Sequence, residues 1–186
     1  MAPRWALLAV ARGSGKTALA AEVAHALVAR GVRVAGVLQE PVLGEDGARV
    51  GYRVVRIGQG ESLRLARLGA EPGAGEESFC SFLFDGEAFA RAGAWLRADA
   101  PRADVVFVDE VSKLEVAGRG HHDAVVALLV GPALPLLAVR ADQLFAVMER
   151  FGLGEPEAAC EGTDPEALDA FAAALVASVR GRSDAG

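Results

Sequence analysis

The segment at residues 13–17, GSGKT, has the residue types of a phosphate-binding loop. It follows an apolar run at residues 5–10 and precedes a helix-like run, an order typical of a strand, a turn and a helix. The first N–H groups of a helix lack internal partners and lie at the positive end of its dipole, so they attract an anion. We expect Lys16 to reach the β- and γ-phosphates of a nucleotide and the Thr17 hydroxyl to bind Mg²⁺.

The residues around this loop form the expected nucleotide site. Glycine permits the tight turns and the close approach of the backbone that phosphate binding needs. The chain has 19 Lys and Arg residues, of which only Lys16 and Lys113 are lysines, and both lie in motif-like stretches. This argues against the alternative of an ordinary glycine turn before a helix. The nucleotide is expected to contact Arg12, Gly13, Ser14, Gly15, Lys16, Thr17 and Ala18.

Val10 departs from the usual pattern, G-x-x-x-x-G-K-[ST], which has glycine at this position. A β-branched residue does not tolerate a positive φ. We therefore expect Val10 to end the strand in extended geometry and the turn to begin at Ala11. Residues 13–17 are intact, so nucleotide binding is expected to persist.

Two consecutive acids, Asp109 and Glu110, follow the apolar run at residues 105–108. In a parallel sheet, binding sites form beyond the carboxyl ends of the strands, where the phosphate loop also lies. Asp109 is expected to meet the Mg²⁺ held by Thr17, and Glu110 to accept a proton from an attacking water. The alternative is an acidic helix cap or turn, which the upstream phosphate loop makes less favourable.

Three further residues are expected at the same edge. Lys113 either stabilises charge in the transition state or pairs with Glu115 in a structural role, which we favour slightly. Arg140 follows an apolar run and is expected to clamp phosphate or to stack on the base. Neighbouring residues do not share a helix face, so His121 and His122 are interpreted as solvated loop histidines and not as a metal site.

The hydrophobic periodicity defines the elements that position these residues. It predicts strands at residues 4–10, 32–39, 104–110 and 134–140, and helices at 16–30, 86–99, 118–131 and 141–152. Between them it predicts an antiparallel hairpin or small meander at 37–68, a mobile loop at 69–78 and a short strand at 79–84. Asp85 is expected to cap the helix at 86–99. A short strand is placed within 154–162, and a capping box of Thr163 and Glu166 is expected to open the last helix.

Alternation of strands and helices predicts an α/β fold. We expect a three-layer sandwich with a mostly parallel sheet, helices on both faces and an antiparallel hairpin at one edge. The chain of 186 residues suits one domain with a sizeable core, here residues 1–180, followed by a flexible tail at 181–186.

Composition narrows the function classes. A hydrophobic fraction of 52% excludes a disordered chain, and a net charge of −6 argues against a nucleic-acid partner. The longest apolar run is interrupted by Gly131, Pro132 and Pro135, so no membrane span is expected. Cys80 and Cys160 have no metal-ligand spacing and are interpreted as reduced, buried thiols of a cytoplasmic protein.

The chain resembles the small P-loop nucleoside-triphosphatases of the thermophilic or cancer-related type. The similarity rests on residues 13–17, 31–42, 50–57 and 105–115, and its more specific part is the segment DEVSKLE. Ser112 stands where that family often has glycine. The resemblance implies a single P-loop domain that hydrolyses ATP, GTP and other nucleotides with Mg²⁺, and it assigns the roles given above to Lys16, Thr17, Asp109 and Glu110.

Two other functions remain open from the sequence. A small-molecule or nucleotide kinase usually needs a basic lid, and the loop at residues 69–78 has no basic residue. A nucleotide-binding adaptor with little turnover, similar to accessory proteins of molybdenum cofactor synthesis, would share the phosphate loop and would act on a protein partner that the sequence does not identify. No N-K-x-D motif follows the strand at 134–140, so base preference is not predicted.

Overall fold

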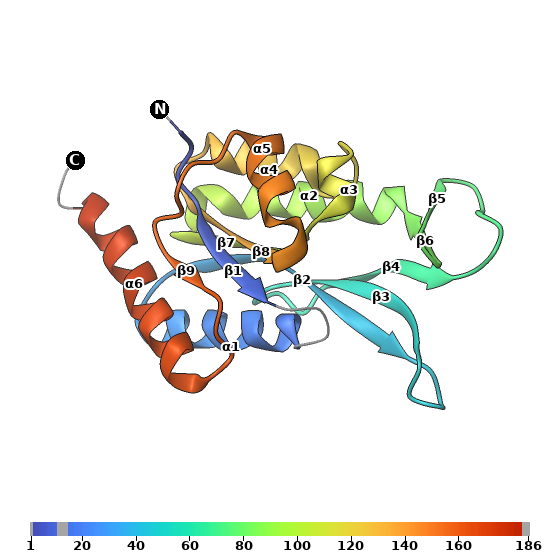
Figure 1. Cartoon of the computed structure of the whole chain (residues 1–186), viewed down its shortest axis with the longest axis horizontal. Helices are drawn as coiled ribbons and strands as arrows, with labels where there is room; N and C mark the ends of the chain where they lie inside the picture. Colours follow the sequence, from blue (N-terminus) through green and yellow to red (C-terminus); the bar gives the residue numbers. More distant parts are fainter. Residues whose placement is uncertain (1, 11–14, 184–186) are drawn as a thin grey trace.

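A computed structural model describes residues 2–10 and 15–183, and within these ranges the chain forms one nine-stranded sheet (Figure 1). Its strand order is β5-β6-β4-β3-β2-β7-β8-β1-β9. The strands are β1 (Ala6–Val10), β2 (Val34–Leu43), β3 (Arg49–Arg56), β4 (Ser62–Leu68), β5 (Glu76–Phe79), β6 (Phe82–Asp85), β7 (Val105–Val111), β8 (Leu134–Arg140) and β9 (Ala159–Cys160). The helices are α1 (Lys16–Ala29), α2 (Gly86–Asp99), α3 (Lys113–Val116), α4 (His122–Leu129), α5 (Leu144–Phe151) and α6 (Pro165–Ser183), with 3-10 turns η1 (Ala100–Arg102) and η2 (Ala141–Gln143).

The strands β2, β7, β8, β1 and β9 pair with one another in parallel. Their continuous apolar runs are buried on both faces, as such runs predict: Val105 and Phe107 of β7 have no exposed surface. β2 and β7 approach closely at Gly36, whose φ is +135°, and a Cβ atom built there would lie 2.3 Å from the main-chain oxygen of Phe107. Only glycine fits this contact.

The end of β2 with β3 and β4 forms the antiparallel meander expected at residues 37–68, and β6 and β5 extend it. β2 continues to Leu43, beyond the expected end at residue 39, and β3, β4, β6 and β5 add to it in antiparallel order. Figure 1 shows these strands extending to one side of the core. Residues 76–78, expected in a mobile loop, belong to β5, because they pair with β6 over a register that the sequence does not reveal.

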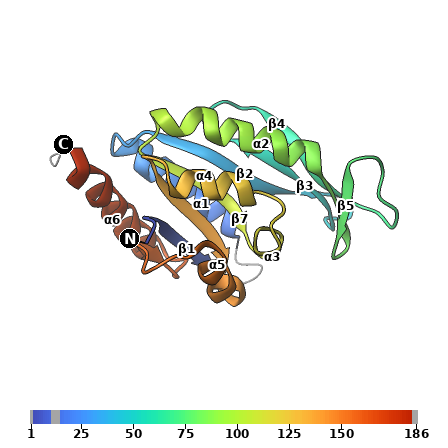
Figure 2. The same cartoon turned by 90° about the horizontal axis from the view of Figure 1, so that it is seen from above.

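Helices cover both faces of the sheet, which confirms the three-layer architecture (Figures 1 and 2). α1 and α6 lie on one face, and α2, α3, α4 and α5 lie on the other. The predicted apolar stripe of α1, formed by Leu19, Val23 and Leu27, is buried against the sheet. None of the helices in the described ranges is both long and apolar enough to cross a membrane.

The helix ends differ in part from the predictions. Asp85 caps α2 as expected, accepting hydrogen bonds from the backbone of Glu87 and Ala88 at 2.9 and 3.1 Å. At the start of α6, Asp164 and not Thr163 accepts the bond from the backbone of Ala167, at 2.9 Å, because the helix begins at Pro165. α6 ends at Ser183, three residues past the expected end of the domain at residue 180.

The two cysteines also differ from each other. Cys160 is buried in β9 as predicted, whereas Cys80 is exposed, which corrects the expectation of two buried thiols. Cys80 lies in the turn between β5 and β6 with a φ of +54°, and its side chain is exposed there. Both are free thiols in the structure.

Candidate active site

Thr17 and Asp109 meet at the edge where the parallel strands end. The Thr17 hydroxyl lies 2.8 Å from Oδ2 of Asp109 and 2.9 Å from the main-chain oxygen of Gln39, and both oxygens can accept its single proton. The backbone N–H of Gln39 donates to the same Oδ2 of Asp109, at 3.1 Å. Three elements, α1, β2 and β7, therefore converge on one carboxylate oxygen.

The parallel order of the sheet explains this convergence. β7 lies beside β2, pairing Val37 with Val108, so Asp109 follows directly beside the end of the parallel part of β2. α1 leads from the strand end of β1 back over the sheet and brings Thr17 to the same edge. Asp109 is 1% exposed, and its hydrogen bonds compensate for the loss of water around the carboxylate.

Gln39 is a site residue that the sequence did not reveal. It contributes main-chain groups, which every residue except proline has, so its side-chain type carries no signal. The available clue was its place after the apolar run of a strand that ends at the same edge as Asp109.

The structure describes the phosphate loop from Gly15 onward. Gly15 precedes the first turn of α1 with a φ of +75°, a conformation that suits glycine. β1 ends at Val10, as predicted from its β-branched side chain. Ala18 is exposed in the first turn of α1. The remaining expected nucleotide contacts lie outside the described residues: Arg12, Gly13, Ser14 and the side chain of Lys16. The same holds for Ala11, where the turn was expected to begin.

Glu110 lies next to Asp109 at a local irregularity of β7. The register with β8 shifts there, pairing Asp109 with Ala138 and Val111 with Val139, as in a β-bulge. A bulge re-aims a side chain relative to a regular strand. Glu110 is half-buried and Asp109 is buried, so the two consecutive acids occupy different environments at the strand end.

Three further residues were predicted at this edge, and their contacts differ from those expected: Lys113, Glu115 and Arg140. Lys113 is exposed at the start of α3, and Glu115 is buried. The expected pair between them does not form: Glu115 instead accepts hydrogen bonds from the backbone of Ser112 and His121, both at 2.9 Å. Arg140 ends β8, and its guanidinium is held by both carboxylate oxygens of Asp142, at 3.1 and 2.6 Å.

His121 corrects the interpretation of both neighbouring histidines as solvated. It is 1% exposed, and its ring lies edge-on to that of Phe89 with 4.9 Å between the centroids. Burial lowers the pKa of His121 to about 4, so the ring is neutral at pH 7. His122 is half-buried and bonds to Asp123 at 2.8 Å and to Arg150 at 3.0 Å. The sequence missed His121 because tertiary packing alone decides that burial.

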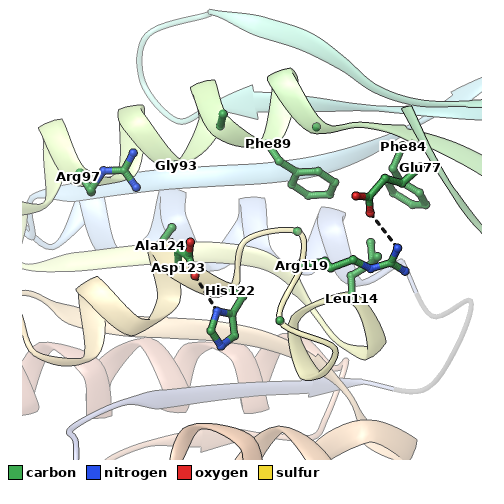
Figure 3. A pocket seen from close by; sticks show the side chains of 14 residues that line it. Glu77, Phe84, Phe89, Gly93, Arg97, Leu114, Arg119, His122, Asp123 and Ala124 are labelled. Atoms are coloured by element: carbon green, nitrogen blue, oxygen red, sulfur yellow. Dashed lines mark hydrogen bonds and ion pairs between the residues drawn. The ribbon is translucent and has the colours of Figure 1, made fainter. Parts of the chain in front are cut away.

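A cavity of about 440 Å³ lies between α2 and the segment that joins α3 to α4 (Figure 3). The ion pair between Arg119 and Glu77, at 2.8 Å, spans one end of it, and Arg97 of α2 points into the other. Its lining residues do not include Thr17, Asp109 or Glu110, so it is separate from their cluster.

Comparisons with known proteins place this geometry in a family. The sequence pattern of the NTPase family matches residues 7–153, which include the phosphate loop and the acidic strand end. The chain belongs to this NTPase family. The expectation of an enzyme that hydrolyses nucleoside triphosphates is thereby confirmed at the level of the family.

Individual members agree with this assignment. The chain is 35% identical over 129 residues to the nucleoside-triphosphatase THEP1 of Thermofilum pendens, covering 69% of each chain. It is 34% identical over 114 residues to THEP1 of Methanopyrus kandleri, covering 61% of this chain and 60% of that one. THEP1 of Pyrococcus abyssi is 30% identical over 127 residues, 68% of each chain.

A solved structure confirms the fold. The solution structure of a human cancer-related nucleoside triphosphatase aligns with a TM-score of 0.69 at 24% identity, covering 96% of this chain and 98% of that chain. At this identity the likeness concerns the architecture, and it matches the P-loop sandwich expected from the sequence.

Proposed function

We propose that this chain is a Mg²⁺-dependent nucleoside triphosphatase whose active site lies at the carboxyl edge of β1 and β7. The observation that carries the proposal is the contact between the Thr17 hydroxyl and Oδ2 of Asp109, 2.8 Å apart, at the start of α1. A hydroxyl and a carboxylate from these two elements are the donors with which phosphate-loop enzymes bind the metal of a metal–nucleotide complex.

The donor chemistry fits Mg²⁺. This ion takes oxygen ligands, usually one or two from the protein and the remainder from phosphates and water. Thr17 and Asp109 would hold it, and once bound it would neutralise charge on the β- and γ-phosphates. The N–H groups at the start of α1 and the ammonium of Lys16 would bind the phosphate oxygens, together with the rest of residues 12–18.

Glu110 is proposed as the general base. Its carboxylate takes a proton from a water molecule while the water oxygen bonds to the γ-phosphorus. The bond between that phosphorus and the oxygen bridging to the β-phosphate breaks, and the products are a nucleoside diphosphate and inorganic phosphate. The support is the place of Glu110 directly after Asp109 on the irregular end of β7.

We also propose the domain organisation, the location and the partners of this enzyme. Residues 1–180 are proposed to form one domain, because α6 packs on α1 and both helices contribute to a common core that includes Leu175 and Leu27. A cytoplasmic location is proposed from the two free thiols, Cys80 and Cys160. The proposed partner is the nucleoside triphosphate itself, with no nucleic acid or membrane involved.

The test is phosphate release from ATP, GTP and CTP with and without Mg²⁺, for the wild type and Lys16→Ala. Lys16→Ala removes the charge expected to face the β- and γ-phosphates, so nucleotide affinity should fall by about tenfold or more. The wild type should release phosphate only when Mg²⁺ is present. Tight binding of Mg²⁺-nucleotide without phosphate release would instead favour the nucleotide-binding adaptor.

A further inference from the structure

The carboxylate of Glu115 is buried and uses both of its oxygens. Glu115 is 2% exposed. Its Oε2 accepts a hydrogen bond from the backbone N–H of Ser112, and its Oε1 accepts one from the backbone N–H of His121, both at 2.9 Å. Burial, with a smaller contribution from the charge of Glu110, raises the pKa of this carboxyl to about 7. Within the described residues, no ion pair with a cationic side chain balances this buried acid.

These two hydrogen bonds connect the strand end to the next helix. Ser112 is two residues after Glu110, and His121 is the residue before α4. Glu115 itself belongs to α3, so one side chain ties together the end of β7, a short helix and the start of α4. A strand end without such hydrogen bonds opens locally with little cost in free energy, because its last main-chain groups lack partners.

The two hydrogen bonds of Glu115 hold the segment that carries the proposed base. The register between β7 and β8 shifts from Asp109 to Val111, and the proposed base lies at that shift. Asp109 is anchored on one side by the main-chain N–H of Gln39. The anchor on the other side is Ser112, whose backbone N–H is bound by Glu115.

The loop before α4 is shaped around the carboxylate. Gly120 has a φ of +62°, and a Cβ atom built on it would lie 2.3 Å from Oε1 of Glu115. Gly118, two residues earlier, has a similar φ of +75°, but a Cβ atom there would meet only the flexible end of Arg150, at 3.3 Å. The shortest contact at Gly120 is therefore with the carboxylate of Glu115, and the Cβ atom of Leu114 follows at 3.2 Å.

We propose that Glu115 is a positioning residue for nucleotide hydrolysis, which fixes Ser112 and the loop before α4 and thereby holds Glu110 in the geometry of a general base. This inference rests on the proposed function. Misplacing a catalytic group by about 1 Å can slow a reaction by about 10²-fold. Loss of the tie should therefore lower the rate of hydrolysis while leaving nucleotide binding, which uses other residues, unchanged.

The first variant is Glu115→Gln, which keeps the size of the side chain and replaces one acceptor oxygen by an N–H donor. Single-turnover hydrolysis should fall by about ten- to a hundredfold, and the Kd for Mg²⁺-nucleotide should stay within about twofold of the wild type. Asp85→Asn is the matched control, because Asp85 also accepts two backbone hydrogen bonds at a helix start, away from the site. Its hydrolysis rate should equal that of the wild type.

The second pair of variants keeps Glu115 and moves it. Gly120→Ala places a methyl group against Oε1, so it should lower hydrolysis in the same way as Glu115→Gln. Gly118→Ala introduces similar backbone strain without that contact and should hydrolyse as the wild type does. If Glu115→Gln does not fold, Gly120→Ala carries the test, and loss of the fold in both overturns the proposal because the tie is then a requirement for folding.

A double-variant cycle separates positioning from a general effect. In a Glu110→Gln background, Glu115→Gln should lower hydrolysis no further, because it acts through a base that is already absent. Equal hydrolysis by Glu115→Gln and the wild type, additive losses in the cycle, or an equal loss in Asp85→Asn would each overturn the inference. A wild type that releases no phosphate would overturn the proposed function instead, so the two failures are distinguishable.

Discussion

Asp109 and Glu110 are adjacent acids with different surroundings, which supports the different roles proposed for them. Asp109 is buried and receives hydrogen bonds from the backbone of Gln39 and from the Thr17 hydroxyl, so its charge is held in place. Glu110 is half-buried at the irregular end of the strand. A fixed carboxylate suits a metal, and a partly solvated one suits proton transfer.

Glu110→Gln tests the role of the base. The amide keeps the size of the side chain but cannot take a proton at neutral pH, so turnover should fall by about 10² to 10⁴. Nucleotide affinity should not change. Single-turnover hydrolysis measured beside equilibrium binding separates the two, with the exposed Glu149→Gln of α5 as the control. Equal rates for Glu110→Gln and the wild type would remove Glu110 from the mechanism.

Two buried residues near the site, His121 and Glu115, have opposite effects on how the stability of the fold depends on pH. Burial lowers the pKa of His121 from 6.5 to about 4, so the stability it contributes is present above pH 6.5 and is lost as the pH falls towards 4. Burial raises the pKa of Glu115 from 4.5 to about 7, so its contribution is present below pH 4.5 and is lost as the pH rises towards 7. In the wild type, the changes in the free energy of unfolding that His121 and Glu115 cause between pH 4.5 and 6.5 have opposite signs and largely cancel.

His121→Leu should expose the slope of Glu115. Leucine is close to histidine in size and does not titrate, so the variant lacks the loss of stability that His121 causes as the pH falls. Relative to the wild type, the free energy of unfolding of the variant should rise by about 3 kcal/mol between pH 7 and pH 4. Urea unfolding of both proteins at pH 7, 6, 5 and 4 measures this difference. Parallel pH profiles for the two proteins would contradict the assignment.

At the scale of elements, the contact between β2 and β7 positions the site. These strands bring the main chain of Gln39 against Asp109, and they can approach closely because Gly36 has no side chain. The apolar run of β7 holds the strand in the core, while the register shift after Asp109 interrupts its regular pairing with β8 at Glu110. The strand pair is thus both a structural unit and a support for the site.

Gly36→Ala should separate these strands. Its methyl group would overlap the main chain of Phe107, and a φ of +135° is strained for alanine. We expect a loss of about 3 kcal/mol or more in the free energy of unfolding, measured by urea titration. Gly47→Ala is the control, since its φ is also positive, at +76°, and a Cβ atom there meets nothing within 4 Å. A loss no larger than that of the control would show that the strand pair can adjust.

The proposed metal–nucleotide complex would join α1 to β7. α1 lies on the face of the sheet that α6 also covers (Figure 1), and β7 is central in the sheet. A ligand that contacts both elements binds the folded chain and not the unfolded one. Such binding stabilises the fold according to ligand concentration.

Mg²⁺ and nucleotide together should therefore raise the free energy of unfolding. At a free ligand concentration 100 times the Kd, the gain should be about 2.7 kcal/mol. Asp109→Asn removes the charge expected to face the metal and should lose the part of this gain that depends on Mg²⁺. The melting temperature of both proteins is measured with Mg²⁺, with nucleotide and with both, using a non-hydrolysed nucleotide analogue. The same Mg²⁺-dependent gain in Asp109→Asn would exclude that residue from the metal site.

Local patterns in the sequence were enough to predict the buried strands, the shared edge of the candidate site and the family. Continuous apolar runs predicted the buried strands β1, β7 and β8, because a strand covered on both faces needs apolar residues at every position. The carboxyl-edge rule for parallel sheets then predicted that Thr17 and Asp109 would lie at the same edge, and their side chains are 2.8 Å apart. The segments GSGKT and DEVSKLE indicated the family.

Features that depend on packing between distant segments could not be predicted from the sequence. The size of the antiparallel part follows from pairing between segments distant in sequence, so local periodicity does not define it. Gln39 serves the site through its main chain, which has no residue-specific signature. His121 and Glu115 are buried because α2, α3 and α4 close over them. A polar residue type predicts exposure, and only the surrounding elements can override it by supplying partners or apolar walls.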